Sequence, residues 1–70
     1  MEFKTGDKVQ LISGGPEMTV NGVLGDGSLN KMENFALTTR GFQLGDVYCQ
    51  WFDGIKLEGS AFKKLILKKL

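Results

Sequence analysis

The feature that most constrains this chain is an alternating run over residues 46–54 that ends abruptly in Asp53-Gly54. Apolar side chains stand at every second position of the run, at Val47, Cys49 and Trp51. The positions between them include groups that favour water, and they are Tyr48, Gln50 and Phe52. Such alternation is typical of a half-buried strand. Because Asp-Gly tolerates the positive φ of a tight turn and residues 55–58 resume the alternation, the sequence predicts a β-hairpin over residues 47–58.

Glycine-rich turns divide the N-terminal part of the chain into two further strands. The first is predicted over residues 8–12 and the second over residues 17–24. Ser13-Gly14-Gly15-Pro16 between them is the strongest turn signal in the chain, and Pro16-Glu17 stand where a phosphate-binding loop would need its lysine. Gly22 indicates a bulge or bend, which would let Val23 face inward.

Two stretches permit more than one interpretation. Residues 27–45 contain Leu29, Met32 and Phe35 at near-helical spacing, but residues 35–38 also fit a short strand. We interpret this stretch as a flexible insertion with one short element, and we expect it to contribute little to the core. The C-terminal Leu65-Ile66-Leu67, between two lysine pairs, fits a last strand or the end of a helix, and we favour a lysine-guarded edge strand.

Five short strands separated by glycine turns predict a single all-β domain over residues 1–70, folded as a small barrel. We expect its core to be formed by the inward positions of these strands, namely Val9, Leu11, Met18, Val20, Val47, Cys49, Trp51, Leu57 and Phe62.

The composition argues against metal binding and catalysis. With no His and a single cysteine, Cys49, the chain lacks the usual metal ligands and the commonest general base, so we expect no metal, no cofactor and no enzymatic activity. Glu2 and Lys4 argue against a signal peptide, and no stretch approaches the roughly 18 apolar residues of a membrane span. We therefore expect no membrane association and, given the unpaired thiol, a cytoplasmic location.

Several motifs together resemble those of a known family. They are the Gly6-Asp7 start, the Ser13-Gly14-Gly15-Pro16 turn leading to Met18, the Cys49-x-Trp51-Phe52-Asp53-Gly54 hairpin, and the Phe62 region. With them the chain resembles the YodC-like family of small uncharacterised bacterial proteins. The resemblance implies an SH3-like barrel and no catalytic residues. Members usually run almost directly from the second strand into the third, so residues 27–45 stand out as an insertion.

The side chains without an internal use define the candidate site. Tyr48 and Phe52 are expected on the outer face of their strand, and the insertion leads into that strand through Phe42. These aromatic residues predict a non-catalytic binding module for a protein or peptide. The alternative is that the insertion permanently covers Tyr48 and Phe52, which leaves no site.

Nucleic-acid binding is the second function considered. Lys63, Lys64, Lys68 and Lys69 lie in the last eight positions, where they could contact phosphate. Nine basic against eight acidic residues argue against this function, because nucleic-acid-binding domains are usually strongly basic.

Overall fold

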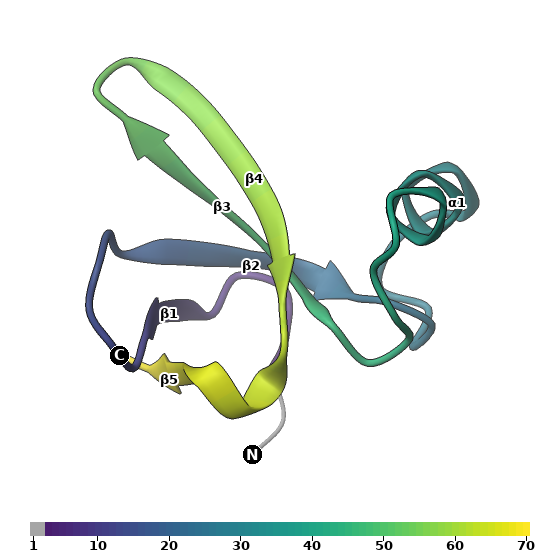
Figure 1. The fold of residues 1–70 in the computed structure, drawn as a ribbon, viewed down its shortest axis with the longest axis horizontal. Coiled ribbons are helices and arrows are strands. Elements are labelled where there is room, and N and C mark those ends of the chain that lie inside the picture. Colours follow the sequence, from purple (N-terminus) through teal and green to yellow (C-terminus); the bar gives the residue numbers. More distant parts are fainter. Residues whose placement is uncertain (1–2) are drawn as a thin grey trace.

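A computed structural model of the chain describes residues 3–70 and shows one five-stranded antiparallel sheet (Figure 1). Its elements in chain order are β1 (Lys8–Leu11), β2 (Met18–Val23), the helix α1 (Lys31–Thr39), β3 (Val47–Asp53), β4 (Lys56–Phe62), the 3-10 helix η1 (Lys64–Ile66) and β5 (Leu67–Lys69). The strand order is β4-β3-β2-β1-β5, so the last strand returns to lie beside the first. The structure thus confirms the predicted all-β class, with one short helix added.

The sheet bends at Gly22, as the sequence predicts. The register between β2 and β3 shifts between Val20 and Gly22, and Val23 beyond the shift is buried. A Cβ atom at Gly22 would lie 2.7 Å from Cδ2 of Leu29, so only glycine leaves room for the chain after β2 to pack against that strand.

The main core lies on the inner side of the bent sheet. Of the predicted core residues, Val9, Met18, Val20, Val47 and Cys49 are buried, and Leu11, Trp51 and Phe62 are half-buried and pack against them. Val23, which the bend was predicted to turn inward, also belongs to this cluster, and Phe3 and Leu67, which were not among the predicted core residues, complete it.

Leu57 is the one predicted core residue that the structure places outside, with 52% of its surface exposed. The hairpin turns through Gly54 and Ile55, with Gly54 at φ +67°, and Asp53 pairs with Lys56. This two-residue loop sets Leu57 directly opposite Phe52. Because directly opposed residues share a face of the sheet, and Phe52 points outward, Leu57 must point outward too.

The insertion is structured around α1; it adds no residue to the main core, as predicted, but it forms a second cluster of buried residues that was not predicted. The helix begins after Asn30, whose side-chain oxygen accepts a hydrogen bond from the Glu33 backbone N–H at 2.8 Å. Its inward residue Leu37 is buried and forms a second apolar cluster with Leu24 and Leu29. The helical alternative was therefore right, although Met32 and Phe35, which indicated it, lie on the exposed side.

The C-terminus combines both interpretations given above. The 3-10 helix η1 comes first, and β5 then pairs with β1. Leu67 is buried, as expected of a closing strand, whereas Leu65 in η1 is 89% exposed and does not share its face.

Candidate protein-contact site

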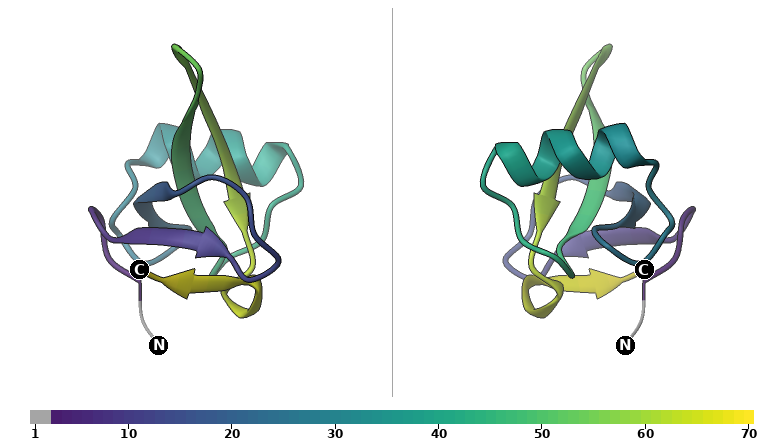
Figure 2. Two further views of the ribbon diagram at one scale, coloured as in Figure 1. Left: turned by 90° about the vertical axis from the view of Figure 1, so that its left-hand side faces the viewer. Right: turned by 90° about the vertical axis from the view of Figure 1, so that its right-hand side faces the viewer.

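The outer face of the β3–β4 hairpin divides into a covered part and an open part. In the right-hand view of Figure 2, α1 crosses in front of the hairpin, and in both views the hairpin end extends beyond the rest of the molecule. Tyr48 lies on the covered part and Phe52 on the open part, so the two aromatic residues predicted to share one site have different surroundings.

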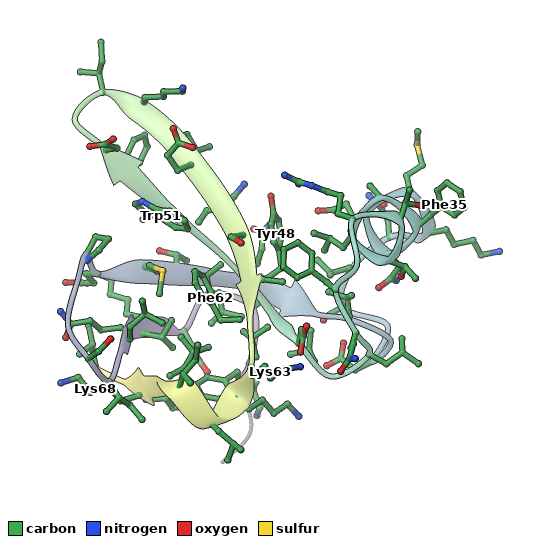
Figure 3. All side chains as sticks on the ribbon, in the orientation of Figure 1. Phe35, Tyr48, Trp51, Phe62, Lys63 and Lys68 are labelled. Atoms are coloured by element: carbon green, nitrogen blue, oxygen red, sulfur yellow. The ribbon has the colours of Figure 1, made fainter. Side chains whose placement is uncertain are left out.

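Tyr48 belongs to the structural interior of the insertion. It is half-buried and packs against the cluster of Leu24, Leu29 and Leu37, between the hairpin and α1 (Figure 3). Its hydroxyl oxygen lies 2.7 Å from the place where a Cβ atom would stand at Gly59, so the tyrosine covers the glycine on the neighbouring strand. The structure therefore agrees, for Tyr48, with the alternative interpretation that the insertion covers this residue and leaves no site there.

Phe52 remains open, with 68% of its surface exposed. Its ring belongs to a shallow hollow of about 320 Å³ on the outer side of the sheet. The residues around this hollow are Glu17, Thr19, Gln50, Trp51, Phe52 and Leu57. Trp51 is half-buried and meets Phe62 on the inner side, with the ring centres 6.1 Å apart.

Three large apolar side chains are thus exposed together at the hairpin end. We call Phe52, Ile55 and Leu57 the hairpin patch; Ile55 in the turn is fully exposed and Leu57 stands opposite Phe52. Sequence reasoning found Phe52 but missed the other two. The spacing of 52 and 57 around a two-residue turn was the signal that would have placed Leu57 on this face.

Phe42 and Lys63 come together at a second hollow, of about 380 Å³, at the base of the hairpin. There the Lys63 ammonium lies 3.6 Å from the buried Asp46 carboxylate and 3.2 Å from the side-chain oxygen of Gln43. Since Asp46 partly neutralises this lysine, Lys63 ties the insertion to the end of β4 rather than offering a free positive charge.

The C-terminal lysines do not form one surface. Lys64 borders a different hollow together with Asp26, and Lys69 lies 3.4 Å from Asp7. Figure 3 shows Lys63 and Lys68 at opposite ends of the lower part of the molecule. Because Lys63, Lys64 and Lys69 each lie near an acid, the lysine cluster read from the sequence is dispersed and largely balanced in space.

The Cys49 thiol is shielded rather than activated. Cys49 is buried, and burial raises the pKa of its thiol to about 11, which keeps it protonated at neutral pH. Within residues 3–70, no three His, Cys, Asp or Glu side chains group as metal ligands would. None of the described helices is both long and apolar enough to cross a membrane.

Fold and site together define a small, mostly β protein with an exposed apolar hairpin end. The chain belongs to the family of uncharacterised small proteins described as DUF2158, whose family model matches residues 4–66. The matched span runs across the insertion and the hairpin patch. Comparison with curated proteins and with solved structures found no significant match.

Proposed function

We propose that this protein is a non-catalytic protein-binding module and that the hairpin patch is its contact surface. The observation that carries the proposal is the joint exposure of Phe52, Ile55 and Leu57 at one end of the molecule. Single exposed apolar residues are normal, whereas a group of them on a projecting element marks a protein-interaction site.

The edge of the sheet beside the patch supports the same function. Within residues 3–70, β4 pairs only with β3, so the other edge of this seven-residue strand has no partner. The opposite edge of the sheet is protected, because β5 has only three residues and two of them are lysines. A seven-residue free edge next to apolar side chains suits a protein segment that adds an extended strand.

We also propose a more specific fold than the all-β class. We infer an SH3-like barrel, supported by the strong bend at Gly22 and by the return of β5 to β1. A cytoplasmic location is part of the same proposal and is supported by the unpaired Cys49. Nucleic-acid binding is less well supported, since most of the C-terminal lysines lie near acids.

Site-specific photo-cross-linking in cells tests the proposal. A photoreactive phenylalanine replaces Ile55, which is fully exposed in the patch, or Met32, which is 83% exposed on α1 and serves as the matched control. We expect protein adducts from position 55 and few from position 32. Adducts in equal yield from both positions, or none from position 55, would contradict the proposal.

A further inference from the structure

We propose that the partner at this edge is a second copy of the chain, whose own β4 pairs antiparallel with β4 around a two-fold axis at Leu57. This inference rests on the proposed function and names the partner. Symmetric dimers require a surface that is complementary to itself. Residues 55–59, in the turn and β4, have such a surface, because their apolar and charged side chains can face suitable partners in a second copy.

The free edge gives such a pairing its backbone contacts. Every second residue of an edge strand points its N–H and C=O groups away from its only neighbour, and an added strand satisfies them. The hairpin end stands clear of β1, β2 and α1 in all three ribbon views, so a second copy has room to approach it (Figures 1 and 2).

Residues 55–59 then match in one register. With the axis at Leu57, each Leu57 lies opposite Leu57 of the second copy. Ile55 lies opposite Gly59, which has no side chain and is covered by Tyr48. Leu57 therefore meets an apolar group, and Ile55 faces the end of the Tyr48 side chain above a residue that adds no bulk of its own.

The charges on the other face select the same register. Lys56 and Glu58 lie within 3.4 Å of each other in one chain, and with the axis at Leu57 each faces its opposite charge in the second copy. Moving the axis to Lys56 would oppose two lysines, and moving it to Glu58 would oppose two glutamates. Like charges directly opposed across strands are destabilising, so both neighbouring registers are disfavoured.

The pairing also extends the apolar surface. Phe52 stands beside Leu57 on the outer face of each copy, so the dimer would carry a continuous stripe of two Leu57 and two Phe52 side chains. The edges are short, and interfaces of this size belong to the weaker class, so we expect a dissociation constant above about 1 μM.

Sedimentation equilibrium with charge variants tests the dimer. The apparent mass should rise from 7.7 kDa towards twice that value as the concentration approaches about 1 mM. Lys56→Glu gives a chain with two acids and Glu58→Lys a chain with two bases, and each should weaken self-association roughly tenfold or more. An equimolar mixture of the two variants should restore dimers, because every opposed pair is again of opposite sign.

The matched control is Lys31→Glu, which makes the same charge change at an exposed position of α1 and should leave association unchanged. Circular dichroism of each variant checks that the fold is kept. A wild-type chain that stays monomeric at about 1 mM, or a mixture that fails to restore dimers, would overturn the proposal. If the chain is monomeric while position 55 still cross-links to another protein, the dimer is refuted and the binding function stands; if both fail, both proposals fall.

Discussion

Shortening Leu37 to alanine should destabilise the whole domain, because this residue anchors the insertion. Leu37 is 3% exposed and contacts the second cluster, which includes Leu24 and Leu29. Buried Leu→Ala substitutions cost about 2–5 kcal/mol, and we expect about 2–3 kcal/mol here because the half-buried Phe42 and Tyr48 at the edge of the cluster can partly close the cavity. A domain of this size has a free energy of unfolding of about 4–10 kcal/mol, so the loss is a large fraction of the total.

Urea unfolding followed by Trp51 fluorescence measures this cost. At a slope of about 1 kcal/mol per molar urea, the midpoint should fall by about 2–3 M. Phe35→Ala is the control on the same helix: Phe35 is 74% exposed, and its loss should change stability by less than about 0.5 kcal/mol. Equal midpoints for the two variants would refute the conclusion that the insertion is part of the folded core.

Three further predictions concern the core, the bend and the acid response. Cys49 should react slowly with a thiol reagent in the native protein and rapidly in denaturant, because it is buried and its pKa is raised to about 11; rapid native labelling would contradict its placement. Gly22→Ala should lower the melting temperature and cost about 1–3 kcal/mol, since the new Cβ would lie 2.7 Å from the Leu29 side chain; an unchanged melting temperature would show that the bend tolerates it. The Asp7 carboxyl has its pKa lowered below 3.8, chiefly by the hydrogen bond from the Lys4 backbone N–H. Its contribution to stability is therefore present above pH 3.8 and is lost as the pH falls through the lower folded pKa, so Asp7→Asn should reduce the acid-induced loss seen in urea midpoints, and a steeper loss would contradict the assignment.

Local patterns predicted the strands well because each strand carries its own alternation. Val47 and Cys49 point inward and Phe52 outward, as the period of two requires. Leu57 was misplaced because its face depends on the length of the turn, and one residue more or less reverses it. The face of the second strand of a hairpin can therefore be predicted only when the number of loop residues is known.

The insertion was harder to predict because its packing depends on distant residues. Leu37 is buried against Leu24 and under Tyr48, which no local pattern brings together. Met32 and Phe35, which stand out in the sequence, are exposed instead. The helix was recognisable from spacing, whereas the side it presents to the sheet was not.

The candidate site was only partly visible for the same reason. An aromatic residue on an outward position, Phe52, can be read from the sequence. That β4 is an edge strand follows from the strand order, which sequence alone left open. Likewise, Phe42 and Lys63 share a hollow only because the fold returns the end of β4 to the insertion.

The most direct test of the contact surface is to map which residues sense self-association. A ¹⁵N-labelled sample diluted stepwise from about 1 mM would show which backbone amides change their chemical shifts as association is lost. We expect changes confined to residues 52–60 in β3, the turn and β4, with α1 unaffected. Changes centred instead on Met32 and Phe35 or on the C-terminal lysines would contradict the claim that the hairpin end is the contact surface, and no changes at any residue would refute the self-association.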